Sequence, residues 1–461
     1  MCGSSPELPF FFLYTYIVGV IVCRMKFGFK YVVVLGVVMV LGLGAAAYTH
    51  LRPTPAAVLQ YKTSEESDVY VRFGMEAYDN IKEHYWMKTT DGDLATLFQL
   101  SVAKAANMQT PPTLATSTRA AVSTMLGTAL AAATSTDAKK DLILRAVQVA
   151  LYNLQPAGRD MLLSGGQEVA LRQEVANIKP ESDLYQDLGV AKGAAPAAVE
   201  SAYQEKKATL EKAKTPEAAQ ELKKVSYAKE VLTNTTNKAL YDQAKVEPTI
   251  FVHQLNKTLY LNISKIAPTT LQEFGNAILA ASTTPGLESL VLDVRGNVGG
   301  ALDFAPYFLG LFIGPNQYAF DFFHQGDYQP QRTSTPHFGE LDRYKEVAVL
   351  TDNMTQSTAE VLTVMFKRFH LGVVVGTKTR GWGTVENTVP FTTIIDPKET
   401  YSMLLVQYIT LREDGLPIEG RGVDPTVNIA DKNWQSQLSQ YIHSASLLGA
   451  VIQTAAKPSL R

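Results

Sequence analysis

The C-terminal half of the chain, residues 249–430, is predicted to fold as an α/β domain. Short aliphatic runs of strand length alternate with helix patterns, and a glycine cluster directly follows one of the runs. We expect strands at residues 257–264, 290–292, 346–351 and 372–376, and helices at residues 269–281 and 361–369. The first run alternates apolar and polar residues, as a half-buried strand does, whereas the continuous aliphatic runs indicate strands buried on both faces.

The first 50 residues are predicted to hold the chain at the cytoplasmic membrane. Residues 31–48 carry no charge over 18 positions, which is nearly enough for a helix that crosses a bilayer core. The preceding segment, RMKFGFK at residues 24–30, has three positive side chains, and such residues stay on the cytoplasmic side of a span. Residues from about 50 to 461 are therefore expected outside the cytoplasm, behind a single-pass anchor.

The exact start of the exported part has alternatives. Translation that begins at Met25 would give a compact anchor of positive residues and an apolar run. A cleaved signal peptide, with its small-residue site at 45–47, would export the same residues without an anchor. In each case residues 51–68, which contain Pro53 and Pro55, are expected to form a linker.

Two helical units are predicted between the linker and the α/β domain. Across residues 69–178 apolar side chains recur at helical spacing, with Tyr78, Ile81 and Tyr85 on one face. Residues 182–246 form a second unit with an amphipathic pattern of its own. A helical tail, residues 431–461, is expected to follow the α/β domain.

The second helical unit carries short motifs in a fixed order. These are Leu-Tyr at 184–185, Leu-Gly-Val at 188–190, Ala-Tyr at 202–203 and Tyr-Asp at 241–242. The pattern resembles a J-domain, a family that stimulates DnaK-type ATPases through a His-Pro-Asp tripeptide. The matching positions here hold Glu211, Lys212 and Ala213. The resemblance therefore implies a helical module that does not stimulate a chaperone ATPase.

Ser357 is the candidate nucleophile. It lies where a buried strand is expected to pass into an apolar helix, so its hydroxyl can project at the strand end beside helix N-terminal amides. Gly296, Gly299 and Gly300 follow a neighbouring strand and permit a tight turn of the backbone. A serine in this position is also a common helix cap, which is the alternative interpretation of Ser357.

Four ordered motifs extend over the α/β domain. They are LVLDVRGNVGG at 290–300, TQSTAE at 355–360, GTKTRGWGTV at 376–385 and LPIEGRGVDP at 416–425. Together they resemble the C-terminal processing, or tail-specific, serine peptidases, although the PDZ domain usual in that family is not visible. The resemblance implies a ClpP/crotonase-like fold with Ser357 as nucleophile. It also implies oxyanion-binding amides at Gly299 or Gly300 and at Thr358.

The resemblance departs from the family at the general base. The family's lysine falls on Trp382, and the glutamine that supports the lysine falls on Glu386. A serine–lysine pair needs a neutral amine that accepts the serine proton, whereas indole only donates a hydrogen bond. Lys378, Glu386 and His370 are the side chains of this region that could replace the missing base.

Three functions remain open on the sequence. The chain could be a membrane-anchored serine peptidase that cleaves C-terminal or unfolded segments of envelope proteins. It could also be a pseudopeptidase that binds such segments without cleaving them, by strand addition, or a scaffold that uses its helical units for protein contacts. Ser357 favours the first function, and Trp382 favours the other two.

The amino-acid composition argues against nucleic-acid binding and against metal or disulfide sites. The net charge of −2 gives no reason to expect a nucleic-acid partner. The two cysteines are Cys2 and Cys23, so the exported part can hold neither a disulfide nor a thiolate metal site. The seven histidines lack the spacing of metal ligands, and no cofactor or metal is expected.

Overall fold

The computed structural model describes residues 62–460, and the predicted membrane segment at residues 31–48 lies outside them. Within the described residues, no helix combines the length and apolar character that crossing a bilayer requires. The end of the predicted linker contains one short 3-10 helix, η1 (Ser64–Ser67).

Four helices open the described part of the chain. They are α3 (Val69–His84), α4 (Asp91–Ala105), α5 (Arg119–Ala131) and α6 (Thr136–Tyr152). Hydroxyl side chains start three of them: Thr90, Thr118 and Ser135 accept backbone N–H groups and satisfy donors that a helix start leaves free. The apolar faces meet in one core, with Phe73, Tyr78 and Ile81 fully buried.

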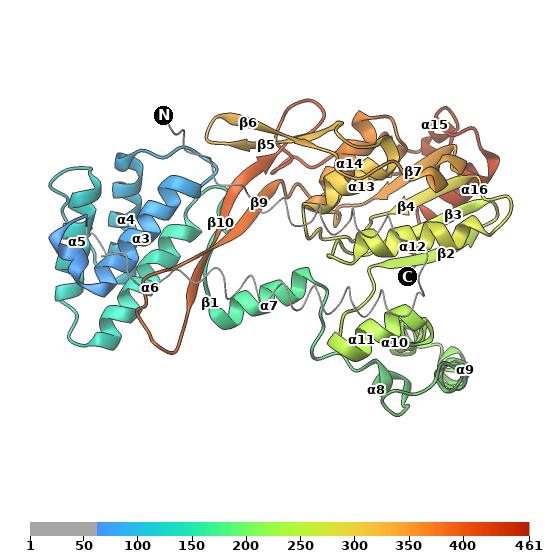
Figure 1. Cartoon of the computed structure of the whole chain (residues 1–461), viewed down its shortest axis with the longest axis horizontal. Helices are drawn as coiled ribbons and strands as arrows, with labels where there is room; N and C mark the ends of the chain where they lie inside the picture. The colour runs from blue at the N-terminus through green and yellow to red at the C-terminus, as the bar shows by residue number, and fades with distance from the viewer. Residues whose placement is uncertain (1–61, 461) are drawn as a thin grey trace, which may run out of the picture. The chain divides into compact units, whose positions relative to one another are not determined.

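The stretch 69–178, expected to be helical throughout, also contains a strand. β1 (Met161–Ser164) pairs antiparallel with β10 (Tyr401–Thr410), and α7 (Gly165–Val175) follows it. The sequence pattern missed β1 because its four residues are too few to show a period, and its partner lies far along the chain. The core of α3–α6 continues onto β10 through Met403 and Leu405. Figure 1 shows β10 beside these helices.

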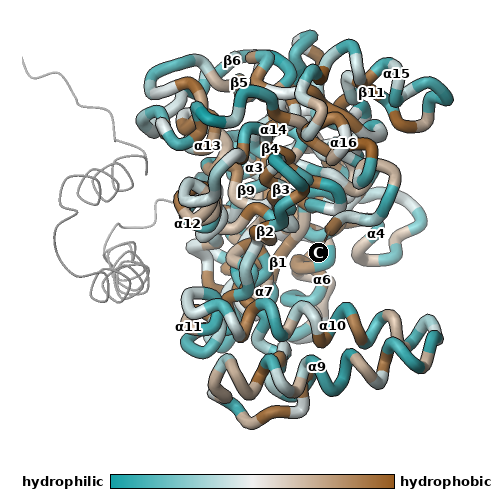
Figure 2. Tube along the Cα trace, turned by 90° about the vertical axis from the view of Figure 1, so that its right-hand side faces the viewer, coloured by the Kyte–Doolittle hydropathy of each residue, from teal (hydrophilic) through white to brown (hydrophobic). Residues whose placement is uncertain are grey.

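Residues 182–246 form a helical insert with its own apolar core. It consists of α8 (Leu184–Leu188), α9 (Pro196–Ala213), α10 (Pro216–Thr233) and α11 (Thr235–Ala244). The long helices α9 and α10 lie side by side and mix apolar with polar residues (Figure 2). Glu211, Lys212 and Ala213 form the last turn of α9, so the positions matched to His-Pro-Asp are helical here.

The two ends of the helical insert meet. Ile178 pairs with Val246 in an isolated antiparallel bridge, and the Lys179 N–H donates to the Lys245 carbonyl at 3.0 Å. Asn177 is buried, and its side-chain amide donates to the Glu247 carbonyl at 2.9 Å. The chain therefore enters and leaves the insert at neighbouring points.

A six-stranded sheet confirms the predicted α/β class. Its order is β11-β8-β7-β4-β3-β2, and only β2 runs antiparallel to its neighbour. The strands are β2 (Ile250–Leu255), β3 (Thr258–Ile263), β4 (Ser289–Asp293), β7 (Glu346–Thr351), β8 (Val373–Gly376) and β11 (Val427–Asn428). All residues of β3 are buried, contrary to the half-buried strand expected from its alternation, because helices cover both faces of the sheet.

The helices on the two sheet faces come from different parts of the chain. α12 (Thr270–Ser282), α13 (Phe304–Ile313) and α14 (Thr358–Arg368) cover one face. The other face is covered by α15 (Trp434–Leu438) and α16 (Ala445–Thr454) from the C-terminal tail. The tail is therefore part of the core of the α/β domain rather than an appendage.

A second sheet was not expected from the sequence. Its order is β1-β10-β5-β6, and β9 (Thr384–Pro390) pairs with β10 as well. β5 (Tyr318–His324) and β6 (Asp327–Arg332) form a hairpin at one side of β10. β10 thereby joins the helices α3–α6 to strand β9, which begins two residues after Trp382.

Candidate active site

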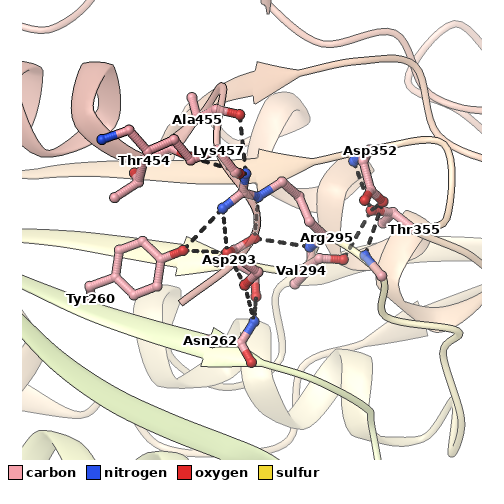
Figure 3. Close-up of polar contacts among 12 residues, drawn as sticks. Tyr260, Asn262, Asp293, Val294, Arg295, Asp352, Thr355, Thr454, Ala455 and Lys457 are labelled. Atoms are coloured by element: carbon pink, nitrogen blue, oxygen red, sulfur yellow. Dashed lines mark hydrogen bonds and ion pairs between the residues drawn. The ribbon is translucent and has the colours of Figure 1, made fainter. Parts of the chain in front are cut away.

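Ser357 lies at the carboxyl end of the parallel sheet. β7 ends at Thr351, a turn follows, and Ser357 directly precedes α14. The turn is fixed by Thr355, whose hydroxyl donates to the Val294 carbonyl at 2.9 Å, and by Asp352, which accepts the Gly296 N–H at 3.0 Å. Figure 3 shows Asp352 and Thr355 beside Val294. The serine turn is thus tied to the loop that follows β4.

The backbone of Ser357 is strained. Its φ of 53° and ψ of −125° belong to a region that L residues with a side chain rarely adopt, at a cost of roughly 1–3 kcal/mol. At the start of α14, the side chain of Glu360 accepts the Ser357 N–H at 2.9 Å, as in a capping box. A strained serine between a strand and a helix is the arrangement of a nucleophile elbow, whereas a capping serine has ordinary extended backbone.

The glycine loop, residues 296–300, packs directly against the serine. A side chain at Gly299 would place its Cβ 2.7 Å from the Ser357 Cβ, and Gly299 has a φ of +86°. A Cβ at Gly300 would overlap the Ile266 carbonyl. Glycine is therefore required at both positions by close approach as well as by backbone conformation.

The two glycines differ in their N–H groups. The Gly299 N–H donates to the buried Asn297 Oδ1 at 2.8 Å, so it is already occupied. In the described part of the chain, the Gly300 and Thr358 N–H groups donate to no other residue. The Thr358 hydroxyl holds the two segments together by donating to the Gly300 carbonyl at 2.9 Å. The pair of free amides is thus Gly300 and Thr358.

Arg295 anchors the start of the glycine loop to the C-terminal tail. Its guanidinium binds both carboxylate oxygens of Asp293, which is fully buried. It also donates to the carbonyls of Thr454, Ala455 and Lys457 at 3.2, 3.1 and 2.6 Å (Figure 3). A cation is favourable at these carbonyls because they close the C-terminus of α16.

Glu360 connects the serine to the position of the family's base. It is fully buried, and its Oε2 accepts the N–H of Ser357 at 2.9 Å and of Trp382 at 2.8 Å. Its Oε1 accepts the Gly381 N–H at 2.7 Å and the Thr379 hydroxyl at 2.5 Å. Burial raises the pKa of Glu360, and the four hydrogen bonds act in the opposite direction. The sequence analysis gave Glu360 no role, although its spacing from Ser357 is that of a capping box.

Trp382 is held on three sides. Its indole Nε1 donates to Glu386 Oε1 at 3.0 Å, and the Thr384 hydroxyl donates to the same oxygen at 2.6 Å. The guanidinium of Arg159 lies over the indole, with its carbon 3.4 Å from the ring centroid. Arg159 Nη2 also donates to Glu419 Oε1 at 2.8 Å. The position that the sequence analysis assigns to the family's lysine thus holds an aromatic ring covered by a cation.

A half-buried carboxyl group, Glu386, and a buried one, Asp160, lie in this region. Burial raises the pKa of Glu386, and hydrogen bonds from Thr384 and Trp382 oppose that shift. Burial, with a smaller contribution from the negative charge of Glu386, raises the pKa of Asp160 to about 7. Asp160 Oδ1 accepts the Val406 N–H at 2.6 Å, while its buried Oδ2 has no partner in the described part of the chain.

The other two predicted substitute bases lie elsewhere. Lys378 is half exposed and its Nζ is 3.6 Å from Asp424. His370 is exposed and follows the C-terminal end of α14, whereas Ser357 precedes its N-terminal end. An 11-residue helix is about 16 Å long, so His370 cannot reach the Ser357 hydroxyl. His370 is therefore excluded as a base by its place in the fold.

Arg159 and Asp160 are contributed by the segment between α6 and β1, and sequence reasoning missed both. Nothing around them in the sequence marks a site, because they reach Trp382 and Val406 only through the pairing of β1 with β10. Only knowledge of that long-range pairing could have brought them to attention.

A strained serine at a strand–helix junction, packed against a glycine loop with free amides, is the arrangement in which serine hydrolases on an α/β sheet hold their nucleophile. Residues 257–429 match the sequence profile described as Peptidase family S41, and this region is a domain of that family. The C-terminal processing serine peptidases, which the four motifs resemble, belong to this family.

Relatives match the chain over the same domain. The probable CtpA-like serine protease of Staphylococcus haemolyticus is 32% identical over 174 residues, which are 38% of this chain and 34% of the relative. The corresponding protein of Staphylococcus epidermidis is 30% identical over 179 residues, with the same shares of 38% and 34%. The chain thus spans about a third of the length of the curated relatives it matches.

Solved structures also align with the chain. The photosystem II D1 C-terminal processing protease covers 80% of this chain and 93% of its own, with a TM-score of 0.45 and 15% identity. A lipoprotein from Streptococcus agalactiae covers 84% of this chain and 99% of its own, with a TM-score of 0.44 and 13% identity.

Proposed function

We propose that this chain binds extended segments of other proteins at a peptidase-type site and does not cleave them by the serine–lysine mechanism of its family. The observation that carries the proposal is Trp382, which stands where the lysine base falls. Its indole has no basic atom, and its one N–H is bonded to Glu386. Without a base, a serine site retains only the effect of its oxyanion donors and of binding, of order 10³–10⁴ over water.

The environment of Lys378 does not favour it as a replacement. A lysine becomes a base near neutral pH when burial lowers its pKa, and Lys378 is half exposed beside the carboxylate of Asp424. Lys378 therefore lacks the burial that such a base requires. The parts that suit binding are nevertheless present: the free amides of Gly300 and Thr358, and a strand, β9, that directly follows Trp382.

The proposed ligands are unfolded or C-terminal segments of proteins. We infer that the chain meets them outside the cytoplasm, anchored by residues 31–48, because the positive residues at 24–30 orient that run. Membrane fractionation, with protease added to intact and to opened cells, tests this location. If the protease digests residues 62–460 only after the cells are opened, the proposed location is contradicted.

The binding proposal is tested by restoring the base. The full chain, the Trp382→Lys/Glu386→Gln variant and a matched Trp382→Phe variant are incubated with an unfolded protein and with a serine-reactive fluorophosphonate. The double change is needed because the Glu386 carboxylate would keep a lysine charged. We expect cleavage and labelling only in the double variant, and their loss when Ser357→Ala is added. Cleavage by the unmodified chain that disappears in Ser357→Ala would refute the proposal.

A second candidate is a slow peptidase that uses Glu386 as the base. The observation in its favour is the burial of Glu386, which raises the pKa of this carboxyl and makes it a stronger base. In that case the unmodified chain would cleave peptide, and Glu386→Gln would abolish cleavage while peptide binding persists. If neither the unmodified chain nor the Glu386→Gln variant cleaves peptide, a slow peptidase with Glu386 as its base is excluded.

A further inference from the structure

The residues around Trp382 include carboxyl groups and one guanidinium. The guanidinium of Arg159 faces Glu419 directly, with both side chains largely buried at 18% and 15% exposure. Glu386 accepts the indole N–H on the edge of the same ring. Asp160, next to Arg159 in the chain, is 1% exposed. The region around Trp382 thus contains three carboxyl groups and one guanidinium group.

The hydrogen-bonding capacity of this region is not fully used. Arg159 lowers the pKa of Glu386, but burial outweighs that effect, and Glu386 in turn raises the pKa of Asp160. Asp160 Oδ2 is buried and has no hydrogen-bond partner in the part of the chain that the structure describes. A buried polar atom without a partner is rare and marks a place where a further group can bind.

The geometry suits one kind of cation. Arg159 lies 3.4 Å from the indole centroid, a distance at which a planar guanidinium stacks on the ring. Its Nη2 meets a carboxylate oxygen of Glu419 at 2.8 Å, and the other Glu419 oxygen accepts the Gly383 N–H at 2.8 Å. A stacking surface with a fixed carboxylate at its edge matches guanidinium better than a compact, strongly hydrated ammonium.

The ring also lies within reach of a peptide at the serine. Glu360 Oε2 accepts the N–H groups of both Ser357 and Trp382, so the backbones of the two residues are joined by one oxygen atom. The side chain of Trp382 is therefore close enough for one residue of a peptide beside Ser357 to contact it. An arginine side chain has the length and the shape for this contact.

We propose that Trp382, Glu419, Glu386 and Asp160 form a subsite for an arginine side chain of a bound peptide, and that Arg159 fills this subsite while no peptide is present. The inference rests on the proposed binding function and names its ligand class as extended peptides that contain arginine. Arg159 retains 18% exposure, which allows its side chain to turn outward. The exchange replaces one guanidinium by another, so the subsite never loses its cation.

The test compares two peptides that differ in one group. Both are unstructured, fluorescein-labelled and identical in sequence, except that a central arginine in one is citrulline in the other. Citrulline keeps the shape of arginine and removes its charge. Binding to the full chain in detergent is measured by fluorescence anisotropy. Because Arg159 must leave the ring first, we expect the arginine peptide to bind the unmodified chain only about 2- to 5-fold more tightly than the citrulline peptide.

Two variants assign that difference to the subsite. Arg159→Ala removes the internal competitor, so the arginine peptide should bind a further few-fold more tightly while the citrulline peptide is unaffected. Glu419→Gln removes the carboxylate and should bring the two peptides close together in affinity. The comparison in the unmodified chain needs no variant, so it stands even where a substitution impairs folding.

The outcomes separate the two proposals. Equal, measurable binding of both peptides to the unmodified chain overturns the arginine subsite and leaves the binding function in place. Failure of both peptides to bind the unmodified chain and Arg159→Ala overturns the binding function and the subsite with it. A preference for arginine that persists in Glu419→Gln and is unchanged in Arg159→Ala places recognition elsewhere and also overturns the subsite.

Discussion

Replacing Glu360 by glutamine should destabilise the fold by several kcal/mol. The carboxylate accepts four hydrogen bonds from buried donors, two on each oxygen. A glutamine amide keeps one acceptor oxygen and turns an NH₂ group toward two of those donors. Two charge-assisted hydrogen bonds are then lost at roughly 1.5–3 kcal/mol each, which predicts a loss of about 3–6 kcal/mol. Urea unfolding followed by tryptophan fluorescence measures it as a lower midpoint at unchanged slope.

The matched control is Glu413→Gln. Glu413 forms an ion pair with Lys367 at the surface, with 28% of its side chain exposed, and should change the unfolding free energy by less than about 0.5 kcal/mol. Glu360→Gln and Glu413→Gln are then each added to the Trp382→Lys/Glu386→Gln variant, and fluorophosphonate labelling is compared. Glu360→Gln should abolish the labelling. A change below about 1 kcal/mol in Glu360→Gln would refute the view that this carboxylate holds the serine and Trp382 in place.

Three further changes have defined outcomes. Burial raises the pKa of Asp160 from 3.8 to about 7, so its ionisation opposes folding, and the stability of the fold decreases as pH rises from about 4 to 7. Asp160→Asn should therefore increase the free energy of unfolding by about 2–4 kcal/mol at pH 8 and change it little at pH 4. Melting temperatures measured at the two pH values test this. Gly299→Ala should lower the melting temperature strongly because its Cβ meets Ser357 at 2.7 Å, whereas Gly275→Ala, with nothing within 4 Å on α12, should raise stability by about 0.5–1 kcal/mol. Arg295→Lys cannot bind both oxygens of Asp293 and the three tail carbonyls at once, and it should expose the tail to proteolysis. An undigested tail would contradict the anchoring role.

The α/β domain and its serine could be predicted because their signals are local. The strands β4, β7 and β8 are continuous aliphatic runs, and the glycine loop is required by the close approach of Gly299 to Ser357. The role of Glu360 was also open to prediction, since a carboxylate three residues after a serine at a helix start is the capping-box spacing.

The second sheet could not be predicted because its pairings are not local. β1 is four residues long and has no period of its own, and it pairs with residues of β10 that follow more than 200 positions later. Arg159 and Asp160 owe their place beside Trp382 to that pairing. The sequence predicts that Trp382 stands at the position of the family's base, but only the fold shows that a guanidinium and three carboxyl groups lie around it.

The meeting of Ile178 and Val246 makes residues 180–244 an exchangeable module. Since the two ends already lie side by side, the rest of the fold needs only a short connection between them. Loop-closure entropy rises slowly with length, at about 0.6 kcal/mol per doubling, so modules of very different size fit at this point at similar cost. Replacement of the insert by a short turn should therefore leave the sheet and the serine turn folded. A lineage could change what this module recognises without altering the domain that contains Ser357.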